Sequence, residues 1–212
     1  MKSKIVFTVF SLIIAFCPVE AQTVSELFLK LPEPVLLTLT VSDRMDLIDM
    51  YKAGEESNTR NFFGDSCSIL SLSDDYLQIR IGKNIMELFI LPMINDSKII
   101  GLIQTVCTPV CDSQLEFYTT TWKKIATSVL ITFAGKYDFL KEEINPKDEI
   151  VKNALIPLDI NMIRLHYDPN KQELYQYYTT PEYLSEMDRV NVKTYLDEKA
   201  KQFKWNLSRF ER

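Results

Sequence analysis

Residues 67–121 constrain the fold of this 212-residue chain more than any other stretch. Short runs rich in Ile, Leu, Val, Tyr and Phe alternate there with turn-forming clusters at 73–75, 83–84, 95–97 and 108–110. Such runs, separated by such turns, are typical of strands joined by hairpins. We therefore predict an antiparallel meander with strands at residues 66–72, 76–82, 85–91, 98–106 and 114–120.

The side chains of the second of these strands alternate in polarity. Tyr76, Gln78 and Arg80 occupy one set of positions, and Leu77, Ile79 and Ile81 occupy the other. Because successive side chains of a strand point to opposite faces, this alternation predicts a sheet with one buried face.

Two helices are expected before the meander. In residues 22–31, Val24, Leu27, Phe28 and Leu31 have the i, i+3, i+4, i+7 spacing of an apolar helix face, with Thr23 or Ser25 as the cap. A second helix should begin with Ser42 as its cap and end at Gly54, with Met45 and Ile48 on its buried side. Residues 36–40 fit either a strand or irregular structure. Residues 55–65 read as a polar loop that turns Phe62 and Phe63 inward.

After the meander, residues 128–133 read as a strand, and residues 161–167 and 173–179 as a hairpin around the turn at 168–171. Thr179, Pro181 and Glu182 predict the start of a helix that runs to about Lys199. Alternation at 203–207 predicts a last strand. The predicted fold class is α+β: a meander sheet packed against a few helices, with a C-terminal hairpin, helix and final strand. We expect one domain over residues 22–212, with two lobes at 22–121 and 122–212 as the alternative.

The N-terminus has the parts of a secretory signal peptide. A basic MKSK start precedes an apolar run at residues 5–17, and the small Ala21 follows. The run is shorter than the roughly 20 residues that cross a bilayer. We therefore predict cleavage near Ala21, no transmembrane segment in the mature chain, and a periplasmic or outer-surface location. Lipidation at Cys17 is the alternative, but such sites favour a small residue before the cysteine, where this chain has Phe16.

The charge balance narrows the class of partner. The whole chain has 24 basic and 29 acidic residues. Without residues 1–21, which include two lysines and one glutamate, the mature chain has 24 − 2 = 22 basic and 29 − 1 = 28 acidic residues, a net charge of −6. This acidic balance without a basic block argues against nucleic acid as the partner.

Cys107 and Cys111 are the sharpest local feature. Exported proteins meet an oxidising compartment, where neighbouring cysteines tend to pair. An extended span of four residues is about 13 Å, too long for a disulfide, so this pair requires a tight turn at residues 108–110, which Pro109 favours. The alternative pairs Cys67 with one of the two across the sheet. If the turn disulfide forms, Cys67 is a small buried core residue. We assign no metal or cofactor, because the spacing fits neither a redox pair nor a zinc site.

Four segments together resemble a known family. SDRMDLIDMYKAG, LSLSDDYLQIRI, LPMINDSKIIGLIQTVCTPVCDSQLEFYTTTW and YYTTPEYLSEMDRVNVKTYL are similar to domain-of-unknown-function family 3256, a family of secreted Bacteroidales proteins. The resemblance spans nearly the whole mature chain. It implies a periplasmic or surface-associated protein of a gut-type anaerobe, and it transfers neither an activity nor functional residues.

The C-terminal hairpin is the predicted place for a binding site. His166, the only histidine, lies there with Tyr167, Tyr175, Tyr177 and Tyr178. Such rings can stack on a sugar or peptide, although cross-strand packing is the alternative. No catalytic residue is assigned, because no nucleophile motif accompanies His166.

Three functions remain open at this point. The first is a non-catalytic binding or interaction module of the cell envelope, whose partner is a protein, glycan or lipid. The second is a periplasmic carrier of a hydrophobic ligand, which a pocket lined by Leu and Phe would favour. The third is a hydrolase of glycan or peptide, which two converging carboxylates in a polar cleft would favour.

Overall fold

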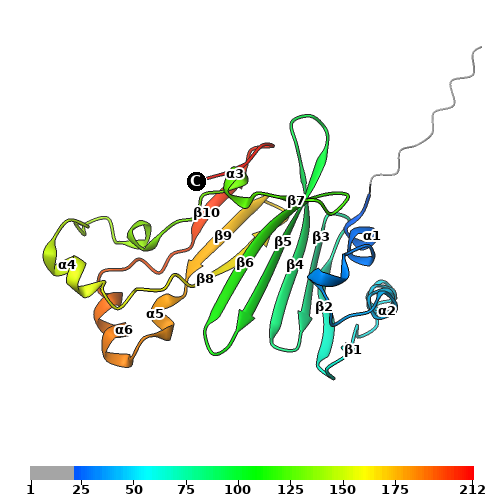
Figure 1. Cartoon of the computed structure of the whole chain (residues 1–212), viewed down its shortest axis with the longest axis horizontal. Helices are drawn as coiled ribbons and strands as arrows, with labels where there is room; N and C mark the ends of the chain where they lie inside the picture. The colour runs from blue at the N-terminus through cyan, green and yellow to red at the C-terminus, as the bar shows by residue number, and fades with distance from the viewer. Residues whose placement is uncertain (1–21) are drawn as a thin grey trace, which may run out of the picture.

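The computed structural model describes residues 22–212 as two antiparallel sheets with short helices around them (Figure 1). The predicted α+β fold is confirmed. The predicted signal peptide, with Cys17, lies outside the described residues. None of the helices in the described part of the chain is long and apolar enough to cross a membrane.

The large sheet is a meander whose neighbouring strands follow one another in chain order. Its strands are β1 (Thr59–Arg60), β2 (Ser66–Leu72), β3 (Tyr76–Ile81), β4 (Asn84–Pro92), β5 (Lys98–Cys107), β6 (Cys111–Thr119) and β7 (Lys124–Ile125). The second sheet has the order β11-β10-β9-β8. Its strands are β8 (Ile163–Asp168), β9 (Glu173–Tyr178), β10 (Lys201–Trp205) and β11 (Phe210–Glu211). The five predicted meander strands and the hairpin therefore form, although β6 begins three residues before the predicted 114 and the short strands β1 and β7 were not predicted.

Short helices surround the sheets. They are α1 (Val24–Leu29), η1 (Glu33–Val35), α2 (Val41–Lys52), α3 (Thr127–Leu130), η2 (Lys136–Phe139), α4 (Glu149–Ala154), α5 (Thr180–Tyr183) and α6 (Glu186–Lys193). In Figure 1, α1 and α2 lie at one end of the large sheet, and α4, α5 and α6 lie at the other, beyond β8.

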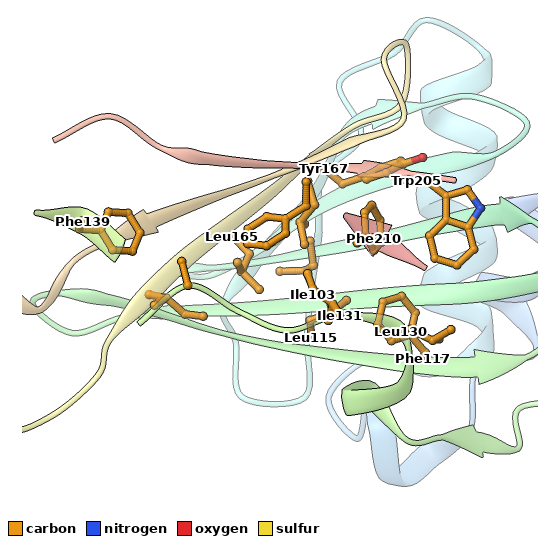
Figure 2. Close-up of a cluster of buried hydrophobic side chains, with 14 of the residues drawn as sticks. Ile103, Leu115, Phe117, Leu130, Ile131, Phe139, Leu165, Tyr167, Trp205 and Phe210 are labelled. Atoms are coloured by element: carbon orange, nitrogen blue, oxygen red, sulfur yellow. The ribbon is translucent and has the colours of Figure 1, made fainter. Parts of the chain in front are cut away.

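The prediction of a single buried face is wrong, because both faces of the large sheet are covered. Leu77 and Leu88 pack under α1 and α2 on one face. On the other, Phe117 belongs to a second core that includes the second sheet and residues 130–158 (Figure 2). Strands β4 and β5 are accordingly buried on both faces. Alternation of buried and exposed side chains persists nearer the edge of the sheet, for example at Arg80 in β3.

Helix α2 differs from its prediction in both its cap and its buried side. Thr40, not Ser42, caps it, in a reciprocal capping box with Asp43. Gly54 follows the helix at φ 74°, the left-handed conformation that glycine adopts without strain. The buried side includes Arg44, which is 2% exposed, whereas the predicted Met45 is 47% exposed.

Arg44 can be buried because it caps the preceding helix. Its Nη1 donates to the backbone carbonyls of Phe28 at 2.7 Å and Leu31 at 3.0 Å, and the Phe28 carbonyl also accepts from the Leu31 amide at 3.3 Å. Burial lowers the pKa of Arg44 from its usual value. One guanidinium thus joins α1 to α2.

Three further predictions are wrong in detail. Residues 128–133 form α3 and an irregular segment rather than a strand. The predicted helix to Lys199 is broken after α5, because the extended Ser185 starts a new helix by accepting a hydrogen bond from the Asp188 amide at 3.2 Å. This second helix, α6, ends at Lys193. The last predicted strand, expected from residue 203, is β10 and begins at Lys201, and a further strand, β11, follows it.

The second sheet attaches to the first through the outer edge of β8. Three alternate amides of this edge donate to side chains of the large sheet, each at 3.0 Å: Ile163 to Asp112, Leu165 to Ser113, and Tyr167 to Glu87. The unpaired amides of an edge strand can otherwise pair with a strand of another chain. Here those amides are used to join the two sheets.

A ring stack connects the same two sheets near the centre of the core. Tyr167 of β8 stacks on Phe89 of β4, with centroids 4.0 Å apart and an interplanar angle of 11°. Phe89 lies against Gly101 of β5, and a Cβ at Gly101 would be 2.2 Å from the ring. Glycine is therefore the residue that lets Phe89 lie flat on the sheet.

Candidate functional site

The predicted histidine pairs with a buried carboxylate that the sequence analysis did not single out. Glu87 of β4 is 2% exposed. It accepts hydrogen bonds from the Tyr76 hydroxyl at 2.9 Å and the Tyr167 amide at 3.0 Å, and one oxygen lies 3.2 Å from His166 Nδ1. The signal for it was present: Glu87 is the one charged side chain in an otherwise apolar run, IMELFIL.

The Glu87 hydrogen bond raises the pKa of His166 above its usual value, against the opposing effect of burial. Burial, followed by the charge of Glu87, raises the pKa of Tyr76, so its phenol stays protonated. A carboxylate that orients an imidazole forms part of the catalytic machinery of hydrolases. Within residues 22–212, however, no hydroxyl or thiol hydrogen-bonds to His166. The contacts that Glu87 makes are those of a structural carboxylate that holds β8 in place.

The predicted tyrosines occupy different environments. Tyr167 is 2% exposed and lies in the core, as Figure 2 shows. Tyr175 is held near the surface by its hydroxyl, which donates to Glu173 at 2.7 Å. Tyr177 lies beneath the Arg164 guanidinium, with 4.2 Å from its carbon to the ring centroid. Tyr178 stacks on Phe139 at 5.2 Å.

Tyr177 and Tyr178 share a pocket of about 250 Å³, which we call the hairpin pocket. It lies between the end of the β8–β9 hairpin, helices α5 and α6, and the tip of the β5–β6 hairpin. Of the five predicted binding residues, only these two line it. Whether the hairpin binds a partner remains a prediction.

The disulfide between Cys107 and Cys111 is present and closes the tip of the β5–β6 hairpin. The two residues face each other as the last pair of the β5–β6 ladder, and their Cα atoms are 3.9 Å apart. Cys67 is free and fully buried in β2. Burial raises the pKa of its thiol, which keeps it in the unreactive protonated form.

The prediction that Phe62 and Phe63 turn inward is wrong: they are 86% and 73% exposed. Instead, Asn61 occupies the interior position and is 6% exposed. Its side-chain oxygen accepts hydrogen bonds from the amides of Phe63 at 3.0 Å and Asp65 at 2.9 Å. Gly64, at φ 85°, completes the turn. We call residues 61–65 the Phe loop. Its backbone is fixed by hydrogen bonds, and its two phenylalanine rings are exposed to solvent.

The Phe loop borders a groove of about 640 Å³ at the end of the large sheet where the β3–β4 and β5–β6 turns lie. We call it the sheet-end groove. Its apolar lining residues are Pro34, Val35, Leu36, Leu37, Phe63, Ile81, Ile85, Met86 and Val106, and the remaining lining residues are polar. Leu37 is 78% exposed and Val106 is 52% exposed. The wall formed by residues 34–38 is held to the sheet, because the Gln104 side-chain amide donates to the Val35 carbonyl at 3.2 Å.

A family model described as a protein of unknown function, DUF3256, matches residues 16–210. This chain belongs to the DUF3256 family. The resemblance drawn from the sequence is confirmed in that respect. Comparison with curated proteins gives no match.

The DUF3256 chain is also similar to a solved structure, a domain of an uncharacterized protein from Porphyromonas gingivalis W83. The two share 24% sequence identity and superpose with a TM-score of 0.77, over 91% of this chain and 100% of the other. At that identity the similarity establishes a shared fold. Neither comparison assigns a function to the hairpin pocket or the sheet-end groove of this DUF3256 chain.

Proposed function

We propose that this DUF3256 chain is an exported interaction module of the cell envelope that binds an apolar segment of a partner protein in the sheet-end groove. The observation that carries the proposal is the exposure of Phe62, Phe63 and Leu37 beside a groove whose lining is half apolar. Contiguous exposed apolar patches mark interaction sites, whereas single exposed apolar residues are ordinary. The N-terminal signal-peptide pattern supports the envelope location.

The Phe loop has the properties of a preformed contact surface. Because Asn61 fixes the loop backbone, little conformational entropy is lost when a partner binds. Burying one such phenylalanine contributes about 1.5–3 kcal/mol. Aromatic anchors of this kind dominate the energetics of many interfaces.

Site-specific photo-crosslinking in the natural host tests this proposal. A benzophenone amino acid at position 63 is expected to form a discrete protein adduct, whereas one at Tyr183, which is 59% exposed on α5, is not. Leu37→Asp should abolish the adduct at position 63, while leaving the fold intact because the side chain is exposed. Equal adducts at both positions, or none at position 63, would overturn the proposal.

Export is tested separately by sequencing the N-terminus of protein taken from the host envelope. The expected mature chain begins close to Gln22. A chain that retains residues 1–21 and is found with the cytosolic proteins would contradict this part of the proposal.

A hydrophobic-ligand carrier is the second candidate, favoured by the volume and apolar lining of the same groove. Native mass spectrometry of protein purified from the host distinguishes it: a co-purified lipid that is lost in Leu37→Asp supports a carrier. The same experiment without a lipid, together with a protein adduct at position 63, supports the interaction module.

A further inference from the structure

The hairpin pocket is separate from the sheet-end groove and has a different chemistry. Its floor consists of side chains that are themselves well packed, such as Thr179 at 4% exposure and Leu196 at 4%. Its walls contain charged groups of both signs. Small-molecule sites are concave, and a few placed polar or charged groups in them set the orientation of the ligand.

Arg164 is the prominent cation of this pocket. It faces Tyr177 across the β8–β9 ladder, and its guanidinium lies over the Tyr177 ring at 4.2 Å. No carboxylate in the described part of the chain lies within ion-pair distance of it. A guanidinium that stacks on a ring through its face keeps its N–H groups free at the edge. Two of these N–H groups can donate parallel hydrogen bonds to the two oxygens of a carboxylate. Arg164 is therefore oriented to receive an anionic group.

The acidic side of the pocket also has unpaired charges. Glu198 forms an ion pair with Lys193 at 2.8 Å, and this hydrogen bond lowers the pKa of Glu198. Glu182, on α5, forms no ion pair or side-chain hydrogen bond within residues 22–212. Asp197, the other carboxylate of the lining, also forms no ion pair within residues 22–212, and its side chain accepts a hydrogen bond from the Lys199 amide at 3.0 Å. The charges left unmatched in the pocket are thus one cation, Arg164, and two carboxylates, Glu182 and Asp197.

Tyr178 borders the pocket at the end of β9, but its ring turns away from Tyr177 and stacks on Phe139 in the core. The groups that a ligand can contact are therefore Arg164, Tyr177 and the acidic side chains. The size of the pocket limits the class of ligand. The volume, about 250 Å³, corresponds to about eight waters at 30 Å³ each, which is the size of an amino acid or a small dipeptide.

We propose that the hairpin pocket binds a small zwitterion of the amino-acid or dipeptide class. Its carboxylate binds Arg164, and its ammonium group binds the acidic side of the pocket, where Glu182 and Asp197 are without an ion pair among the described residues. The proposal is independent of the partner proposed for the sheet-end groove, because the two sites share no lining residue.

Isothermal titration and NMR titration with L-alanyl-L-alanine and with a mixture of the twenty amino acids test it on the full mature chain. Binding of at least one of these zwitterions is expected, with chemical-shift changes at Arg164 and Tyr177. The same ligand should lose affinity by about tenfold or more when its amine is acetylated or its carboxyl amidated. Absence of binding by every zwitterion, or equal binding of the blocked forms, would overturn the proposal.

Matched variants locate the site. Arg164→Gln should weaken binding about tenfold or more, and Arg164→Lys should restore it only in part because an ammonium lacks the planar fork. Arg80→Gln, which removes an exposed arginine from β3, outside the pocket, should bind like the wild type. Circular dichroism confirms that each variant is folded. Unchanged affinity in a folded Arg164→Gln protein would show that the ligand binds elsewhere.

Discussion

The replacement of Gly101 by alanine should be among the most damaging single-methyl additions in this protein. The new Cβ would lie 2.2 Å from two carbons of the Phe89 ring, whereas ordinary contact begins at 3.4 Å. The ring would have to move by 3.4 − 2.2 = 1.2 Å. Tyr167 already stacks on that ring at 4.0 Å, and both rings are almost completely buried, so the surrounding core has little room to yield.

Overpacking of this kind costs typically 1–3 kcal/mol, and the confined stack places Gly101→Ala at about 3 kcal/mol. For a chain of this length, each kcal/mol lowers the melting temperature by about 2–4 °C. The expected loss is therefore about 6–12 °C. Chemical denaturation measured by tryptophan fluorescence, together with a thermal melt, gives both quantities.

Gly135→Ala is the matched control. A Cβ at Gly135 meets no atom closer than 3.9 Å, and the backbone has φ −93°, which alanine adopts freely. Its effect should stay within about 1 kcal/mol. Phe89→Leu in the Gly101→Ala background should recover part of the loss, because neighbouring side chains couple. A Gly101→Ala protein as stable as the Gly135→Ala control, or a purely additive double variant, would refute the steric explanation.

Four other outcomes follow from contacts described above. The pKa of His166 is raised in the folded state, so its stabilising contribution is full below the unfolded pKa of about 6.5 and is lost as pH rises through the folded pKa. His166→Gln should therefore flatten that part of the curve of unfolding free energy against pH. An unchanged curve would show that this pH dependence does not come from His166. Arg44→Met should destabilise the fold by about 3 kcal/mol in urea titrations, because the carbonyls of Phe28 and Leu31 lose a buried charged donor, and a loss below about 1 kcal/mol would count against the capping role. Opening the disulfide by Cys107→Ser should cost about 2 kcal/mol from its five-residue loop, measured against the wild type under the same non-reducing conditions. Mass mapping of the native wild type should show Cys107 linked to Cys111, and Cys67 should be alkylated only after denaturation; rapid labelling of the native protein would disprove its burial.

The meander and the C-terminal hairpin could be predicted because local signals determine them. Turn clusters and strand-length apolar runs are short-range features, and the ladders form where they indicate. The number of layers could not be predicted in the same way. The alternation at Gln78 and Arg80 reports an environment near the edge of the sheet, while the second sheet that covers the centre comes from residues more than 80 positions later.

The candidate sites show the same limit. Glu87 and Arg44 are buried because distant backbone groups complete their hydrogen bonds, and no local pattern encodes those partners. Hydrophobicity alone predicted that Phe62 and Phe63 turn inward. The Asn61 side chain occupies the interior position instead, because its oxygen accepts hydrogen bonds from two amides of the loop. The Arg164–Tyr177 contact, by contrast, follows directly from the hairpin register, which the turn at 168–171 sets.

The edge of β8 has a consequence for folding cooperativity. Its amides at 163, 165 and 167 find their acceptors only on the large sheet, so residues 122–212 alone would keep three amides without these partners. A slip of β8 by one residue would also exchange its buried and exposed side chains, which fixes its register against the large sheet. We therefore expect the two sheets to unfold in a single transition, with the second sheet forming only on the completed meander.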